Sequence, residues 1–179
     1  MNYLEAKKIM GANLIGPAEL AKIKKQLGIK NPLLLKIPPV PFNEKLLQKL
    51  KRDYLLILGS SKTAAWRPLT INELRKKLGY NPKLAEPCFY NQDWYLKEKF
   101  AARATLADRW YIIKKTIASK SQGREPEKLI KSLNKRASLP SAILSAYAFF
   151  AYYFLNKSQK LWVNNFIWCV DTDHNGDRI

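Results

Sequence analysis

Four oxygen-bearing side chains near the C-terminus have the spacing that opens a calcium-binding loop. They are Asp171, Asp173, Asn175 and Asp177. Alternate oxygens of this kind coordinate calcium, and Gly176 stands where such a loop turns sharply. The sequence does not contain the bidentate acid that completes the loop at its twelfth position, so we expect weak calcium binding at most. The competing interpretation is an acidic turn whose short side chains bond nearby backbone amides.

A second group of residues, between positions 90 and 115, combines aromatic rings with cations. Its members are Tyr90, Trp94, Tyr95, Lys97, Lys99, Arg109, Lys114 and Lys115. Rings flanked by cations can stack unpaired bases and neutralise phosphates, which makes this group a candidate surface for nucleic acid. The alternative is that the aromatic residues belong to the core, because Trp110 and Ile112 alternate with their neighbours as in a half-buried strand.

The overall charge fits the same hypothesis. Lysine and arginine total 32 against 14 acidic residues, which gives a net charge of +18. The excess is +11 in residues 1–90 and +7 in residues 91–179, so it is diffuse rather than confined to a tail. Such a surface attracts phosphate polymers. The alternative is that the lysines only solvate helix faces.

Residue types that support nucleophilic chemistry are scarce. The chain has one histidine, His174, and two isolated cysteines, Cys88 and Cys169, without CxxC spacing. The segment 55–63 joins an apolar run to a lysine and a threonine but lacks the paired glycines of a phosphate loop. No catalytic constellation is evident, which favours a non-enzymatic role. The isolated cysteines and the lack of a secretory signal in residues 1–27 predict a cytoplasmic location.

Hydrophobic periodicity predicts an α+β fold. It has several short helices and one long buried helix, packed on a small sheet that is mostly antiparallel or mixed. The uncharged segment 137–156 contains Pro140 and three serines, so it predicts a buried helix at 141–155 rather than a membrane span. The other expected helices are 2–11, 17–28, 43–51, 70–79, 97–106 and 126–136. The expected strands are 54–58, 109–114 and 165–170.

The C-terminal residues predict an incomplete hairpin. Asn175-Gly176 is a strong turn signal, but only residues 177–179 follow it. This would leave 166–170 as a poorly paired edge, through which the chain could associate with itself. We therefore expect an N-terminal body at 1–164 and, at 165–179, the start of a truncated C-terminal hairpin or domain.

Several segments together carry a family resemblance. They are EAKKIMGANLIGPAEL, LLILG, LTINELRKKLG, CFYNQDWYLKEKFA, RWYIIKK, LPSAILSAYAFFAYYFLNKSQKLW and FIWCVDTDHNGDRI. The series resembles a family of uncharacterised bacterial proteins whose longer members carry a C-terminal C-type-lectin-like variable domain of the kind diversified by retroelements. The resemblance implies a non-enzymatic scaffold or interaction domain that presents such a ligand-binding domain. The partner of residues 1–164 would then be the C-terminal domain of the same protein. A nucleic-acid-binding protein is the alternative.

Overall fold

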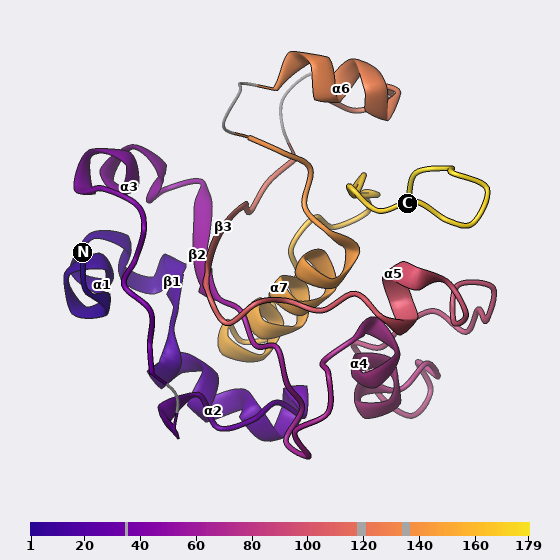
Figure 1. Cartoon of the computed structure of the whole chain (residues 1–179), viewed down its shortest axis with the longest axis horizontal. Coiled ribbons are helices and arrows are strands. Elements are labelled where there is room, and N and C mark those ends of the chain that lie inside the picture. Colours follow the sequence, from indigo (N-terminus) through magenta and orange to yellow (C-terminus); the bar gives the residue numbers. More distant parts are fainter. Residues whose placement is uncertain (35, 118–120, 134–136) are drawn as a thin grey trace.

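The helices surround one short sheet. The computed structural model describes residues 1–34, 36–117, 121–133 and 137–179. Within these residues the fold is α+β, as predicted (Figure 1). The helices are α1 (Tyr3–Met10), α2 (Pro17–Leu27), α3 (Glu44–Leu50), α4 (Ile71–Leu78), α5 (Lys99–Ala102), α6 (Pro126–Ser132) and α7 (Ala142–Leu155), with short 3₁₀ turns at Gly11–Asn13 and Pro32–Leu34. The strands are β1 (Leu14–Ile15), β2 (Tyr54–Leu58) and β3 (Trp110–Lys114).

Strand β2 is the centre of the sheet, whose order is β1-β2-β3. It pairs in parallel with β1 and antiparallel with β3, with Leu56 opposite Leu14 on one side and Ile112 on the other. Residues 55–58 are all buried, which explains why β2 is a continuous apolar run rather than an alternating one.

The two faces of the sheet are covered by different helices. Figure 1 shows β2 between α1 and α3 on one side and α7 on the other. Trp110 of β3 stacks on Tyr3 of α1, with ring centroids 6.0 Å apart. On α7, the fully buried Tyr147 donates a hydrogen bond to the Leu58 carbonyl at 3.3 Å. Helix α7 also packs against α2, α4 and α5, so it is the buried helix that the sequence predicts.

One predicted helix is much shorter than expected. The prediction was 97–106, but α5 ends at Ala102. The chain beyond it leaves the helix because Asp108 is held by two other segments: Ser61 donates to it at 2.7 Å and Lys30 at 2.6 Å. Helix α6 was predicted to reach residue 136, and residues 134–136 lie outside the described residues.

The predicted strand at 165–170 is wrong. These residues join no ladder, because their backbone groups are used elsewhere: Cys169 N–H donates to the Ile179 carbonyl at 2.6 Å, and Val170 N–H to the Pro140 carbonyl at 2.9 Å. Conversely, the two residues of β1 were not predicted, because a strand of that length has no readable period.

The Asn175-Gly176 turn forms as predicted. Asp173 N–H donates to the Asp177 carbonyl at 2.9 Å, and Gly176 has the positive φ of 89° that such turns favour. The returning residues pair locally, with Thr172 opposite Arg178. Ile179 packs against the core. The division of the chain at residue 165 stays a prediction.

Crossing a bilayer takes a longer apolar helix than any that the described residues form. The most apolar of them, α7, has 14 residues.

The central position of β2 generates a stability prediction. Leu56→Ala should lower the free energy of unfolding by about 2–5 kcal/mol, because it leaves a cavity between the sheet and its helices. Leu4→Ala is the matched control, since Leu4 is 67% exposed, and should change it by less than about 0.5 kcal/mol. Urea unfolding followed by tryptophan fluorescence measures both, and equal losses would contradict the assignment of the core.

Candidate functional site

The residues of the predicted calcium loop are bound to separate backbone amides. Asp171 accepts a hydrogen bond from Ala142 N–H at the start of α7, at 2.6 Å. Asp173 accepts from the amides of Asn175 and Asp177, both at 2.9 Å. This arrangement matches the acidic-turn interpretation. Nowhere in the described ranges do three His, Cys, Asp or Glu side chains gather in a way that could hold a metal ion.

The predicted nucleic-acid residues fall into two groups. Tyr90, Trp94, Lys97 and Lys99 are exposed near α5. The other three cations lie along β3: Arg109 and Lys114 at opposite ends of the strand, about 17 Å apart by strand geometry, and Lys115 just after it. Arg109 lies over the Tyr111 ring at 5.0 Å, and Lys115 donates to Asn13 at 2.9 Å. Among the described residues, no hydrogen bond, ion pair or ring contact links the two groups, and their role in binding stays a prediction.

Tyr95 is half-buried among neighbouring side chains, which leaves less of its ring open for stacking, and its role in binding stays a prediction. The Tyr95 ring lies against Phe100, with ring centroids 6.5 Å apart. The Arg75 guanidinium lies 6.0 Å from the centroid of the Tyr95 ring. Burial raises the pKa of Tyr95. Arg75 itself is buried, stacks on Tyr80 at 4.3 Å and donates to Asp93 at 2.8 Å. The sequence analysis missed this arginine, because nothing in its helix marks it as buried.

A serine, a lysine and an aspartate converge where β2 ends. The Lys30 ammonium lies 2.6 Å from Asp108 and 3.4 Å from the Ser61 hydroxyl, which itself donates to Asp108 at 2.9 Å. Because the ammonium is engaged by the carboxylate, it is not placed to take a proton from Ser61. We interpret the cluster as a clamp that fixes the chain after β2 to the chain before β3.

Neither described thiol nor imidazole forms a nucleophile–base pair. Burial raises the pKa of the Cys169 thiol to about 11, which disfavours the reactive thiolate. His174 is paired with Glu98 at 2.6 Å, and the hydrogen bond and charge of Glu98 raise the pKa of His174. This pair ties the C-terminal turn to the start of α5.

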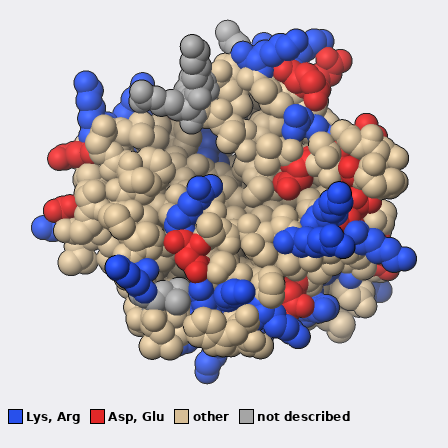
Figure 2. All heavy atoms as spheres, in the orientation of Figure 1, with Lys and Arg blue, Asp and Glu red and all other residues tan. Residues whose placement is uncertain are grey.

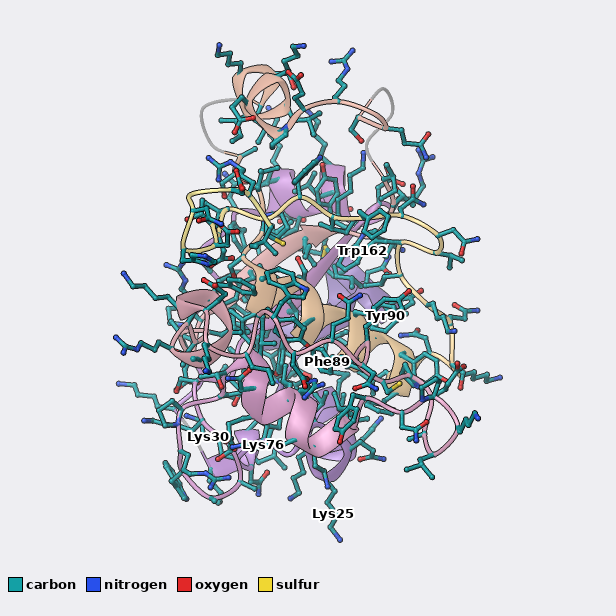
Figure 3. The ribbon with its side chains drawn as sticks, turned by 90° about the vertical axis from the view of Figure 1, so that its right-hand side faces the viewer. Lys25, Lys30, Lys76, Phe89, Tyr90 and Trp162 are labelled. Carbon is teal, nitrogen blue, oxygen red and sulfur yellow. The ribbon has the colours of Figure 1, made fainter. Side chains whose placement is uncertain are left out.

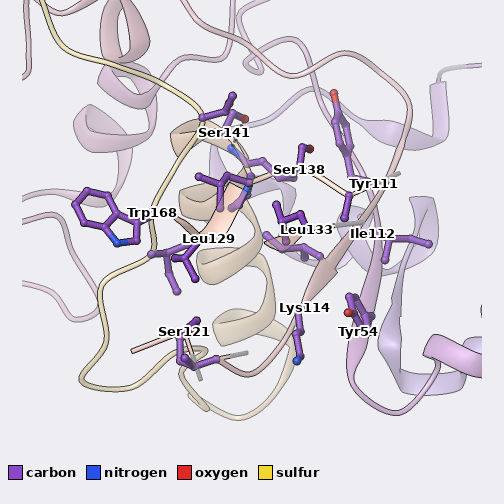
Figure 4. A pocket seen from close by; sticks show the side chains of 18 of the residues that line it. Tyr54, Tyr111, Ile112, Lys114, Ser121, Leu129, Leu133, Ser138, Ser141 and Trp168 are labelled. Atoms are coloured by element: carbon purple, nitrogen blue, oxygen red, sulfur yellow. Dashed lines mark hydrogen bonds between the residues drawn. The ribbon is translucent and has the colours of Figure 1, made fainter. Parts of the chain in front are cut away.

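A large groove lies beside β3, with a volume of about 2460 Å³. All five residues of β3 line one side of it, and α6 and the C-terminal segment line the others. Figure 4 shows Ile112 and Lys114 on the strand, with Leu129 and Leu133 across from them and Trp168 beyond. We call this feature the β3 groove.

The edge of β3 that faces the groove pairs with no other strand of the described chain. Gly59 N–H donates to the Arg109 carbonyl, and Lys115 N–H to the Asp53 carbonyl, both at 2.9 Å. In an antiparallel ladder these bonds fix the alternation, so residues 109, 111, 113 and 115 bond β2, and residues 110, 112 and 114 point away from it. One of the outward groups, the Lys114 carbonyl, accepts a hydrogen bond from the Trp162 indole N–H at 3.0 Å. No hydrogen bond joins the Ile112 backbone to another described residue.

The walls of the groove are apolar, and its charged residues are mostly basic. Phe166 is 99% exposed and Val170 is 51% exposed, so much of their apolar surface is open to solvent. The cations that line the groove are Lys49, Arg109, Lys114 and Arg124. The acid among its lining residues, Glu125, is paired with Lys128 at 2.9 Å. The sequence analysis placed the free edge at 166–170, whereas the structure places it on β3.

Comparisons with family models, with curated proteins and with solved structures found no match to this chain.

The clamp generates a pH-dependent prediction. Burial raises the pKa of Asp108, but hydrogen bonds from Lys30 and Ser61 lower it more, so the pKa lies below its usual 3.8. The charged form therefore stabilises the fold at neutral pH, and this contribution is lost as the pH falls through the lowered pKa. Asp108→Asn should cost about 1–3 kcal/mol of unfolding free energy at pH 7, because it leaves Lys30 buried without its partner.

The measurement is urea unfolding of wild type and variant at pH 7 and at a series of lower pH values that extends well below 3.8, because the pKa of Asp108 lies below that value. The difference between the two proteins should shrink in acid, where wild-type Asp108 is also neutral. Asp177→Asn is the control, since that carboxylate has no ion pair with a described residue. A loss that is the same at every pH value, or equally large for Asp177→Asn, would contradict the clamp.

Proposed function

We propose that this chain is a non-enzymatic interaction domain that holds an extended polypeptide segment in the β3 groove. The observation that carries the proposal is the outward-facing backbone of β3, above all the unpaired N–H and C=O of Ile112. A strand laid beside β3 would satisfy these groups, and adding a strand to a free sheet edge is a recurrent mode of peptide recognition.

The chemistry of the walls specifies the segment. In a bound strand, alternate side chains point to opposite faces, so an apolar set can cover the walls while the other set faces the charged rim. The rim carries four cations, and its acid is already paired with Lys128. The occupant is therefore a partner segment in which apolar residues alternate with aspartate or glutamate.

The area of exposed apolar surface supports a macromolecular partner. Phe166, Trp168 and Val170 are exposed along one segment, while Cys169 between them is buried. Contiguous apolar surface of this kind typically marks an interaction site. The presentation of a C-terminal lectin-like domain, also expected for a scaffold, rests on the sequence resemblance alone.

The test is a selection of random dodecapeptides, displayed on phage, against the intact chain. Enriched peptides should alternate apolar and acidic residues. Ile112→Pro should weaken their binding at least about tenfold, because proline removes the outward N–H without removing a bond to β2. Binding of synthetic copies of these peptides is measured by fluorescence anisotropy.

Ile112→Ala is the matched control, because it shortens the same side chain but keeps the N–H, and it should weaken binding less than Ile112→Pro does. Thermal unfolding establishes that both variants fold. The proposal fails if no peptide is enriched, or if Ile112→Pro binds as well as Ile112→Ala. It also fails if light scattering shows a dimer that Ile112→Pro dissociates, since the occupant would then be a second copy of the chain.

A further inference from the structure

The loop that connects β2 to α4 forms a second, separate feature, which we call the Trp66 loop (residues 60–68). It doubles back on itself, with Lys62 opposite Pro68 and with Thr63 N–H donating to the Arg67 carbonyl at 2.8 Å. Ala64 N–H donates to the Gly28 carbonyl at 2.8 Å, which fixes the loop to the end of α2. The loop is therefore held at its base and near its tip.

Trp66 stands at the tip in an unusual conformation. Its φ is 62°, a region that a bulky residue rarely adopts, and its N–H is fixed by the Thr63 carbonyl at 2.9 Å. Yet the side chain is 62% exposed, so packing of the indole into the core does not account for this backbone. Strained residues of this kind cluster at functional sites.

One cation lies over the indole and another lies beside Gly28, to which the loop is fixed. The Lys30 ammonium lies 5.8 Å from the ring centroid, and Lys77 lies directly over Gly28, where an added Cβ would meet its side chain at 3.0 Å. The acids close to the loop are already engaged: Asp108 by Lys30, and Glu73 by Arg67 and Lys76. On α2, α4 and the Trp66 loop, the cations without an ion pair to any described residue are Lys22, Lys24, Lys25, Lys62 and Lys77.

The charge distribution of the molecule agrees with this local picture. Figure 2 shows lysine and arginine outnumbering acids along the lower part of the face, where α2 and α4 lie in Figure 1. In Figure 3, Lys25, Lys30 and Lys76 lie toward the lower end of the molecule, whereas Trp162, which lines the β3 groove, lies well above them. The Trp66 loop is therefore distinct from the groove.

We propose that the Trp66 loop, with the adjoining ends of α2 and α4, binds single-stranded nucleic acid. The exposed indole supplies a flat face on which an unpaired base stacks, and the unpaired lysines neutralise the phosphates on either side of it. A duplex does not offer a base face to this ring, so the single strand is the ligand. The inference does not depend on the proposed function of the groove.

This site differs from the surface predicted between residues 90 and 115. Both hypotheses rest on an aromatic ring among cations. The neighbours of the Trp66 loop, however, come from the end of α2 and from α4, which are far apart in the sequence. Trp94, an exposed tryptophan of the predicted surface, instead contacts Tyr95 and Phe100, with centroids 5.6 and 6.2 Å away. The two tryptophans thus provide a matched comparison.

The experiment measures binding of the full chain to a fluorescein-labelled oligothymidylate of about 15 nucleotides by anisotropy, across a range of salt concentrations. Trp66→Ala should weaken binding about tenfold, and Trp66→Phe should retain most of it, because a ring remains. Replacing Lys24, Lys25 and Lys77 with serine should reduce the slope of log affinity against log salt by about 2, which corresponds to roughly 0.7 per phosphate contact.

Trp94→Ala is the control for the ring and should leave the affinity within about twofold of wild type. The double variant Lys97→Ser with Lys99→Ser is the control for the lysines. It should also stay within about twofold of wild type, once the general loss of affinity that follows from a lower net charge is allowed for. Thermal unfolding checks that each variant folds. The inference is overturned if Trp66→Ala binds like wild type, if Trp94→Ala loses as much, or if a duplex of equal length binds more tightly. It is also overturned if anionic phosphatidylserine vesicles, but not the oligonucleotide, depend on Trp66.

Discussion

The fold depends on the burial of β2. Residues 55–58 are buried, so their backbone groups need partners on both sides, and side chains must cover both faces. Strand β1 supplies only two residues on one side, which leaves β3 as the main partner. The helices then pack where the sheet requires apolar cover, with Tyr147 of α7 reaching the last carbonyl of β2. Because β3 completes the sheet, its outer backbone groups are the ones left open.

The placement of the acids explains how the net charge of +18 is distributed over the surface. Many of its 14 acidic side chains are engaged in structural contacts. Glu19, for example, binds Lys7 at 2.8 Å and caps α2 through Gly16 N–H at 2.9 Å, and Asp171 caps α7. Acids used in this way are not free to neutralise the lysines of exposed helix faces. The surface is therefore basic wherever no structural acid is near, as around Trp66.

The helices and strands that depend on neighbouring residues in the sequence could be predicted from it. The expected ranges 54–58, 70–79 and 17–28 match β2, α4 and α2 within a residue or two. Residues 165–170 alternate like a strand, with Phe166 exposed and Cys169 buried, but their amides are taken by Pro140 and Ile179, which lie apart in sequence. Pairing partners of this kind cannot be read from periodicity.

The candidate surfaces were harder to predict than the elements. The groove exists because residues 121–133 and 137–141 line the side opposite β3 instead of packing against the strand. Trp66 becomes part of a basic surface only when Gly28 and Lys77 come beside its loop. Both depend on long-range placement. The sequence analysis selected residues 90–115 because aromatic residues and cations are closest together there in the sequence. Trp66 is isolated in the sequence, so the same criterion did not select it.

The central claim is that β3 presents an open edge, and amide hydrogen exchange of the free chain, resolved by residue with NMR, tests it most directly. The account predicts alternation: the amides of Tyr111 and Ile113, bonded to β2, exchange slowly, and those of Ile112 and Lys114 exchange fast. Slow exchange at all four positions would mean that the edge is already covered, and would contradict the account.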